Sequence, residues 1–144
     1  MHAPAGQDPE LLWAPDSKRF GFSYSPMHAH HMTFQSIVFY QLRGDKWVAL
    51  DSPADETKGP QLARFGKGHL PKHFDPRHCA PEWDIMKLRK WSDANTAIVY
   101  ATCYGRESGK LEAGLLFTLK FDDAGNWKII KTHQMSKKEL EEEQ

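Results

Sequence analysis

The chain has 144 residues, the usual length of a single domain, and a chain of this size can bury roughly 70% of its unfolded surface around one core. Its 19 basic residues balance its 19 acidic residues, so no overall electrostatic field favours nucleic acid or an anionic membrane as a partner. The content of Phe, Trp and Tyr exceeds that of a disordered chain and suits strands better than helices.

The first nine residues are polar, contain Pro and Gly, and lack the basic and apolar regions of a signal peptide. No apolar run approaches the ~20 residues of a membrane span, so we expect a soluble protein. The same segment also fits the remainder of an exported protein after signal removal, with Met1 added for expression. Both origins stay open, and an extracytoplasmic location is the expectation that we adopt.

The first half of the sequence predicts four strands joined by a tight turn, a longer loop and a second tight turn. Pro, Gly and Asp mark the tight turns, which run from Pro15 to Lys18 and from Arg43 to Asp45. The longer loop runs from Ser25 to Met32. The predicted strands are residues 11–13, 19–24, 33–42 and 46–50.

Residues 51–83 form a long connection that is rich in Pro, Gly, Lys and His and has no sustained periodicity. Residues 61–65 could make one helical turn. We expect the connection to pack over a sheet edge, because Lys and Pro are residues that prevent an edge from pairing.

The second half repeats the arrangement of the first. Apolar side chains alternate with other residues along 115–121, which is the period-2 pattern of a strand with one buried face. Ser136 and Glu139 have the spacing of a capping box and predict a short, solvated C-terminal helix. The predicted strands are residues 85–91, 96–104, 114–121 and 127–131.

The two halves match each other at an offset of 78 residues (91 − 13), which carries Trp13 onto Trp91 and strand 37–39 onto 115–117. A last turn that is two residues longer in the second half raises the offset to 80 (127 − 47). Equivalent positions in a repeat are expected to pack alike. We therefore expect four tryptophans in the core, namely Trp13, Trp47, Trp91 and Trp127.

The run Leu12-Trp13-Ala14-Pro15-Asp16-Ser17-Lys18 and the strand after it resemble the opening of a TolB-type, WD40-like β-propeller repeat. Ile37 to Leu42 resembles the third strand of that repeat, and Gly44 to Trp47 its last turn. The resemblance covers residues 11–50 well and 85–131 more weakly, because Ser92 to Asn95 lacks a Pro-Asp pair. It implies blade-like sheets that present loops for recognition, although propellers have at least four blades and this chain supplies two.

The run Gly125 to Gln134 is similar to the last strand of NTF2-like proteins of the ketosteroid-isomerase or SnoaL kind. That resemblance implies a pocket inside a curved sheet, and a small-molecule enzyme or binding protein is therefore the alternative function. Those folds open with amphipathic helices, whereas residues 1–60 predict strands.

Histidines gather in two loop regions. His28, His30 and His31 lie in the loop between the second and third strands, and the long connection contains His69, His73, His78 and Cys79. Imidazole and thiolate suit zinc or copper, but in an extended stretch His28 and His30 point to one side and His31 to the other. The spacing matches no known metal site, so we expect no metal and no cofactor. Cys79 and Cys103 allow one disulfide, and whether they pair stays open.

No motif marks a catalytic set. Ser, His and Asp are present without a Gly-x-Ser-x-Gly elbow, no cysteine signature occurs, and phosphate-binding Gly-rich loops are absent. We therefore predict no catalytic residues and interpret the chain as a non-catalytic binding or interaction module of unknown ligand. The candidate contact residues are His28, His30, His31 and Trp83, which lies outside the repeat.

Together these features predict an all-β fold of two four-stranded antiparallel, blade-like sheets that pack face to face as a sandwich, with a short C-terminal helix. The chain then forms one domain, 1–144, in which the long connection lets the second sheet fold back over the first. We expect a monomer, and a ring of three chains is the alternative. The parts are repeat 11–50, connection 51–83, repeat 84–131 and tail 132–144.

Overall fold

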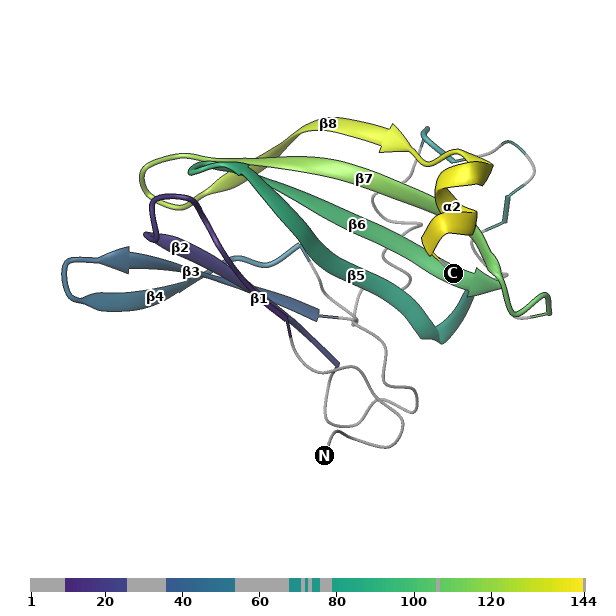
Figure 1. The fold of residues 1–144 in the computed structure, drawn as a ribbon, viewed down its shortest axis with the longest axis horizontal. Helices are drawn as coiled ribbons and strands as arrows, with labels where there is room; N and C mark the ends of the chain where they lie inside the picture. Colours follow the sequence, from purple (N-terminus) through teal and green to yellow (C-terminus); the bar gives the residue numbers. More distant parts are fainter. Residues whose placement is uncertain are drawn as a thin grey trace.

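The computed structural model describes residues 10–25, 36–53, 68–70, 72, 74–75, 79–105 and 107–143, without the side chains of 79–84, 103, 112 and 143. The chain forms two four-stranded antiparallel sheets and a short helix, as predicted (Figure 1). The first sheet contains β1 (Glu10–Trp13), β2 (Arg19–Tyr24), β3 (Ser36–Arg43) and β4 (Lys46–Leu50). The second contains β5 (Cys79–Asp93), β6 (Thr96–Gly105), β7 (Leu111–Phe121) and β8 (Trp127–Gln134), and α2 spans Lys137–Glu143.

In both sheets the spatial order of the strands follows their order in the chain, so each sheet is a meander of hairpins. The turns β1–β2, β3–β4, β5–β6 and β7–β8 all lie at one end of the molecule (Figure 1). The strands of the second sheet are longer than predicted, and β5 begins at Cys79 instead of residue 85. Pro81 is tolerated there because β5 is an edge strand and its pairing is irregular between Cys79 and Asp84.

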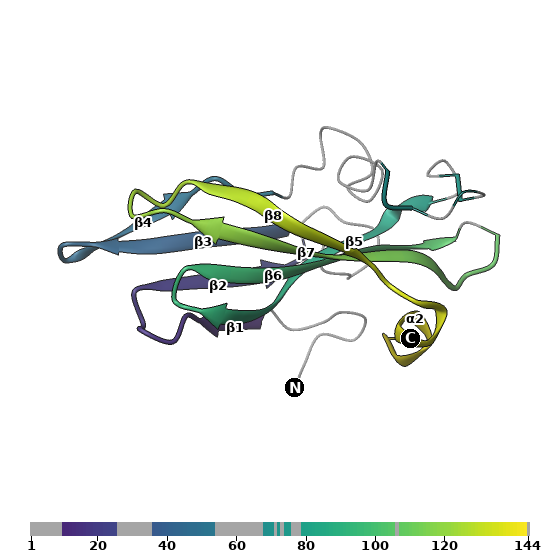
Figure 2. The same cartoon turned by 90° about the horizontal axis from the view of Figure 1, so that it is seen from above.

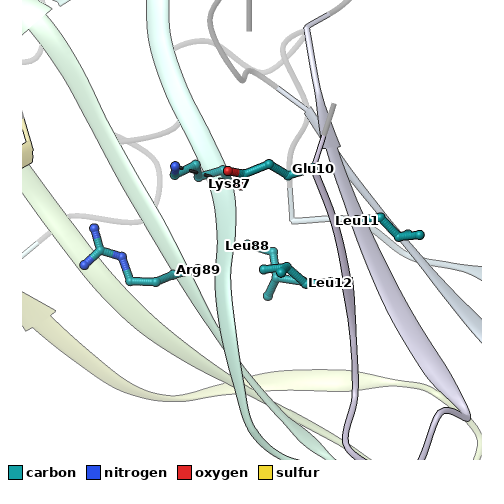
Figure 3. Close-up of a pocket in the computed structure, with 6 residues that line it drawn as sticks. All are labelled: Glu10, Leu11, Leu12, Lys87, Leu88 and Arg89. Carbon is teal, nitrogen blue, oxygen red and sulfur yellow. Dashed lines mark ion pairs between the residues drawn. The ribbon is translucent and has the colours of Figure 1, made fainter. Parts of the chain in front are cut away.

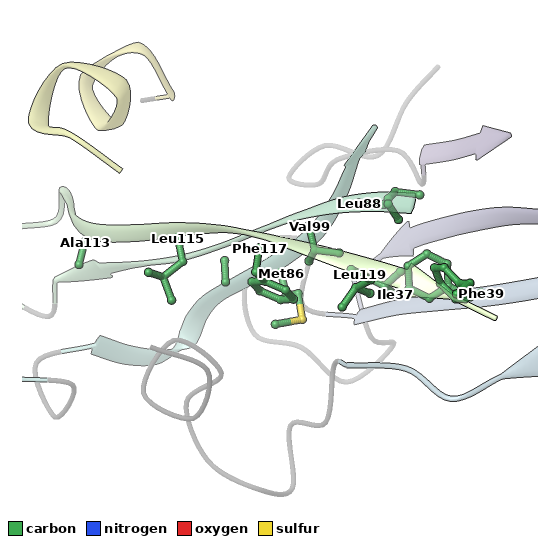
Figure 4. Close-up of a cluster of buried hydrophobic side chains, with 12 residues drawn as sticks. Ile37, Phe39, Met86, Leu88, Val99, Ala113, Leu115, Phe117 and Leu119 are labelled. Atoms are coloured by element: carbon green, nitrogen blue, oxygen red, sulfur yellow. The ribbon is translucent and has the colours of Figure 1, made fainter. Parts of the chain in front are cut away.

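The main core lies between the two sheets (Figure 4). Ile37 and Phe39 of β3 are fully buried against the inner face of the second sheet. Leu70 and Phe74 of the long connection also pack against this core. The buried residues that the second sheet contributes are Met86, Leu88, Ala97, Val99, Ala101, Ala113, Leu115, Phe117, Leu119 and Phe121.

The inner face of β2 carries small or polar residues instead of large apolar ones. Gly21 faces Leu88, and a Cβ atom added at Gly21 would lie 2.3 Å from Cδ2 of that side chain. Ser23 accepts a hydrogen bond through Oγ from the backbone N–H of Leu88 at 3.0 Å. The close approach of β5 to β2 therefore requires small side chains at both positions of β2.

Helix α2 covers part of the outer face of the second sheet, at the end away from the four turns (Figures 1 and 2). Met135 and Leu140 pack there with Tyr100 and Leu111 in a second buried cluster. A Cβ added at Gly114 would lie 2.8 Å from Sδ of Met135 and 2.9 Å from Cδ2 of Leu140. The helix thus lies directly on the backbone of β7.

The predicted capping box is present at the start of α2. The backbone N–H of Glu139 donates to Ser136 Oγ at 3.2 Å, and the backbone N–H of Ser136 donates to Glu139 Oε1 at 2.9 Å. Glu139 Oε1 also lies 3.1 Å from His133 Nε2. The hydrogen bonds from Ser136 and His133 lower the pKa of Glu139 below its ordinary value.

Replacing Ser136 by alanine should increase the amide hydrogen exchange rate of Leu140 about fivefold, because an N-cap contributes about 1 kcal/mol to helix stability. The backbone N–H of Leu140 donates to Ser136 O, so its exchange reports on the first turn of α2. Ser136→Asp keeps a capping oxygen and should exchange at the wild-type rate. Equal exchange in Ser136→Ala and wild type would show that packing alone holds the helix.

The same contact has a defined pH dependence. The pKa of Glu139 is lower in the folded state than in the unfolded chain. The ionised carboxylate therefore stabilises the folded state fully at pH values above the unfolded-state pKa. That contribution is lost as the pH falls through the lower, folded pKa. Protection of Leu140 should therefore weaken in acid before the core residues lose theirs.

Candidate functional site

The structure does not describe the side chains of the four residues that the sequence predicted as contacts. His28, His30 and His31 lie outside the described residues. Trp83 lies in the first part of β5, and the structure describes its backbone but not its side chain. The side chains of Cys79 and Cys103 are likewise outside the description, so whether the two cysteines pair stays open.

The part of the chain that the structure describes contains no group of three His, Cys, Asp or Glu side chains that could hold a metal ion. His28, His30 and His31 are outside that part, so the expected absence of a metal site stays untested.

A polar network centred on Arg19 lies between the sheets and has a structural role. Arg19 of β2 is only 6% exposed and faces its cross-strand neighbour Gln41, to whose Oε1 its Nε donates at 2.7 Å. Its Nη1 donates to Ala94 O at 3.0 Å and to Asn95 Oδ1 at 2.7 Å, and its Nη2 donates to Asp122 O at 2.7 Å. The guanidinium therefore joins the first sheet to two turns of the second.

Burial lowers the pKa of Arg19, and the carboxylates of Asp16, Asp123 and Asp122 oppose that effect. An arginine keeps its charge under such a shift, so the network holds a charged donor among carbonyl and amide oxygens. Every nitrogen of the guanidinium is engaged by the protein itself. The guanidinium therefore serves to hold the two sheets together.

A groove of about 290 Å³ separates β1 from β5 (Figure 3). Its polar feature is the ion pair between Lys87 Nζ and Glu10 Oε2 at 4.0 Å. Leu12 points from β1 toward Leu88, whereas Leu11 points away to the other side of β1 (Figure 3). The groove thus marks the junction of the sheets, and Leu11 belongs to the opposite, outer face of the first sheet.

That outer face carries a cluster of aromatic side chains on all four strands, which we call the aromatic cluster. Its members are Trp13 of β1, Phe20 of β2, Tyr40 of β3 and Trp47 of β4. Trp13 is 49% exposed and Trp47 is 40% exposed, and the neighbouring Leu11 is 46% exposed. Burying such surface is favourable, so a contiguous exposed apolar face of this kind is a candidate contact surface.

The two tryptophans of the aromatic cluster lean toward each other. β1 and β4 are the outer strands of the sheet and lie about 14 Å apart at strand spacing. The ring centroids of Trp13 and Trp47 are nevertheless only 5.5 Å apart, and they lie 4.9 Å and 5.1 Å from the Phe20 ring. The indoles therefore converge above Phe20 and present their other sides to solvent.

The equivalent surface of the second sheet is built from different residues. The β2–β3 and β6–β7 hairpins have the same register. A shift of 78 residues (97 − 19 and 119 − 41) carries the pairs from Arg19↔Gln41 to Tyr24↔Ser36 onto those from Ala97↔Leu119 to Thr102↔Gly114. Phe20 and Tyr40 then correspond to Ile98 and Thr118, and Leu42 to Lys120. The fold is thus built without an aromatic cluster at this place in the second sheet.

The prediction that all four repeat tryptophans are buried in the core is wrong for Trp13 and Trp47. Trp91 and Trp127 do pack against the core. Trp13 pairs with Phe20, but Trp91 pairs with Ala97 and not with Ile98, because the β5–β6 register shifts near Leu88 and again near Trp91. A shift of one residue moves a side chain to the other face of a sheet, and it separates the first pair of tryptophans.

The second pair is separated in the same way. Trp47 pairs with Leu42 of the outer face, whereas Trp127 pairs with Phe121 of the inner face. The indole N–H of Trp127 donates to Asp51 O at 2.8 Å, and that of Trp91 donates to Leu12 O at 3.0 Å. The two partly buried indoles thus link the sheets, and the two more exposed ones remain on the outer face.

Comparison of the chain with known families, curated proteins and solved structures finds no match in any of the three. The propeller-type and NTF2-like resemblances therefore stay predictions. Among the described residues, no helix has both the length and the apolar character to cross a bilayer.

Proposed function

We propose that this protein is a non-catalytic binding module and that the aromatic cluster is the centre of its contact surface. One observation carries the proposal: four rings cover the solvent side of the first sheet, and two of them, Trp13 and Trp47, are about half exposed. Tryptophan and tyrosine are enriched at the energetically dominant positions of protein interfaces.

The second sheet provides an internal comparison that supports the proposal. At the places equivalent to Phe20, Tyr40 and Leu42 it has Ile98, Thr118 and Lys120. An outer sheet face that only meets solvent is expected to be polar, as at two of those three places. Folding alone therefore does not require aromatic residues there. We also propose that the equal registers reflect a duplicated blade-like unit.

The proposal can be tested by photo-crosslinking in cells that produce the protein, with a benzoylphenylalanine in place of Trp47. We expect a covalent adduct with one discrete species, and an affinity for that species that is about 30-fold lower in Trp13→Ser, the loss typical of a residue that dominates an interface. The matched control places the same probe at Ile130, which is 53% exposed on the second sheet. The same adducts from both positions, or none from position 47, would reject the proposed surface.

A further inference from the structure

We propose that the outer face of the second sheet is a second contact surface, which binds a short acidic segment of a partner protein in an extended conformation. The inference goes beyond the proposed function, because it concerns the other sheet and does not depend on the aromatic cluster. Its basis is a group of four exposed lysines on this face, which we call the lysine cluster. Its members are Lys90 of β5, Lys120 of β7, and Lys128 and Lys131 of β8.

The register places the lysine cluster on two neighbouring rows of the outer face. Leu119 and Phe121 of β7 are buried in the core, so Lys120 between them points outward. Lys128 lies directly opposite Lys120. The rows span four strands, about 14 Å, and lie about 7 Å apart. The second row is two residues further along β7 and consists of Lys90, Ile98, Thr118 and Lys131.

Solvation and edge protection do not account for the whole lysine cluster. A sheet face that meets solvent needs polar side chains, but not side chains of one charge. Lysines on edge strands prevent pairing with another chain, which accounts for the lysines of β5 and β8. Lys120 lies on the inner strand β7, and like charges directly opposite each other destabilise a sheet. The Lys120↔Lys128 pair is therefore unfavourable for folding, and an anionic partner would remove the repulsion.

Two carboxylates close to the lysine cluster are bonded within their own turns. Asp93 Oδ1 accepts a backbone N–H of the β5–β6 turn at 2.8 Å, and Asp122 Oδ1 accepts one of the β7–β8 turn at 2.9 Å. In the part of the chain that the structure describes, no ion pair involves a member of the cluster. A hollow of about 500 Å³ lies beside Lys120 and Lys128, and Asp122 also lines it. The hollow gives an anionic side chain of a partner a place between these two lysines.

The space above the lysine cluster is a narrow strip between the four turns and α2 (Figure 1). On β7 the next row after Thr118 contains Leu116, which already packs with α2. The helix is about 10 Å across and stands above the sheet. A bilayer or a nucleic acid duplex is wider than the strip and would meet acidic side chains at both of its ends. These are Glu139, Glu141 and Glu142 of α2, and Asp93, Asp122 and Asp123 of the turns.

A single strand of nucleic acid is also disfavoured. Such strands bind by stacking their bases on aromatic side chains. Tyr100 and Tyr104, the described aromatic residues of this face, pack in the buried cluster under α2. The surface therefore offers charge without a stacking platform, which suits carboxylates better than bases.

An extended acidic segment that crosses the strands matches the spacing of the lysines. Side chains at alternate positions of an extended chain point the same way and lie about 7 Å apart. Three such side chains span about 14 Å, which is the width of the sheet from Lys128 on β8 to Lys90 on β5. We therefore infer that the partner segment has acidic residues at every second position.

The test uses the full chain in about 0.15 M salt, where exposed charges more than about 8 Å apart are screened, and the end-blocked peptide Glu-Ser-Glu-Ser-Glu as the probe. We expect saturable shifts of the backbone amide resonances of Lys120 and Lys128 and none at Trp13. Lys120→Gln with Lys128→Gln should bind the peptide about tenfold more weakly, because each exposed ion pair contributes a factor of about two to five. This variant should unfold at the urea concentration of the wild type or above it, because the repulsion between the two lysines is gone.

The matched control is Lys46→Gln with Lys110→Gln, which removes two exposed lysines outside the cluster and should bind the peptide as the wild type does. Equal binding by the two double variants, or unchanged resonances at millimolar peptide, would overturn the inference. Equal binding of Glu-Glu-Glu-Ser-Ser would overturn the extended conformation.

The other occupants have their own outcomes. Inorganic phosphate that causes the same shifts at the same concentration would give the hollow to a free anion. Binding to phosphatidylserine vesicles or to a DNA duplex that is lost in Lys120→Gln with Lys128→Gln would give the face to a membrane or to nucleic acid. Each of these results would overturn the acidic segment, and none of them affects the crosslinking test of the aromatic cluster.

Discussion

Replacing Phe39 by alanine should lower the free energy of unfolding by about 3–5 kcal/mol, the usual cost of removing a fully buried aromatic side chain. Phe39 has no exposed surface and lies between the sheets. Its ring contacts Phe121 at 5.2 Å and Trp91 at 5.9 Å, both edge to face. The truncation leaves a cavity that the two rings of the second sheet cannot fill without separating from each other.

Urea unfolding followed by tryptophan fluorescence measures this effect. Phe22→Ala is a matched control, because Phe22 lies on the outer face of the same sheet and is only partly buried. We expect it to cost less than half as much. Equal losses in the two variants would mean that the interface between the sheets is not the main core.

Replacing Arg19 by alanine should lower the free energy of unfolding by about 3 kcal/mol or more, since it removes a buried charged donor and leaves its acceptors without partners. Four acceptors lose a hydrogen bond, namely Gln41 Oε1, Ala94 O, Asn95 Oδ1 and Asp122 O. The side chain also lies over the Phe121 ring, 5.2 Å from its centroid. Arg19→Lys should recover only part of the loss, because an ammonium group lacks the planar fork that reaches two turns at once.

The control for Arg19 is Arg43→Ala. Arg43 is exposed and donates one hydrogen bond to Ala124 O across the same gap between the sheets. Its removal should change the free energy of unfolding by less than about 1 kcal/mol. Equal losses of unfolding free energy in Arg19→Ala and Arg43→Ala, measured by urea unfolding, would mean that the burial of Arg19 has no energetic consequence. The network would then not hold the sheets together.

The sequence by itself determined the strands and their order, apart from the ends of those in the second sheet, and the local structure of the turns and of α2. Period-2 alternation identified β7, and Gly44 with Asp45 placed the turn between β3 and β4, because these signals depend on neighbouring residues only. The capping box of Ser136 and Glu139 is local in the same sense. The equal offset of the central hairpins was also readable, and the structure confirms it as an equal register.

The tertiary structure decided which face of each strand is buried. In β2 the alternation of Arg19, Gly21 and Ser23 with Phe20 and Phe22 would by hydrophobicity place the aromatic residues in the core. The opposite occurs, because side chains of β5 such as Leu88 already fill the space above Gly21, and the other sheet supplies the acceptors that Arg19 needs.

The aromatic cluster depends on which face of each strand is buried, and the sequence repeat could not predict that. Trp13 and Trp91 occupy matching places in the sequence, as do Trp47 and Trp127, yet one member of each pair is exposed and the other packs against the core. A register shift next to Trp91 in β5 reverses the face of that residue, and Trp127 lies on the inner face because it pairs with Phe121 and not with Lys120, the equivalent of Leu42. Sequence periodicity distinguishes the two faces of a strand, but which face is buried depends on the side chains that the opposite sheet brings against it.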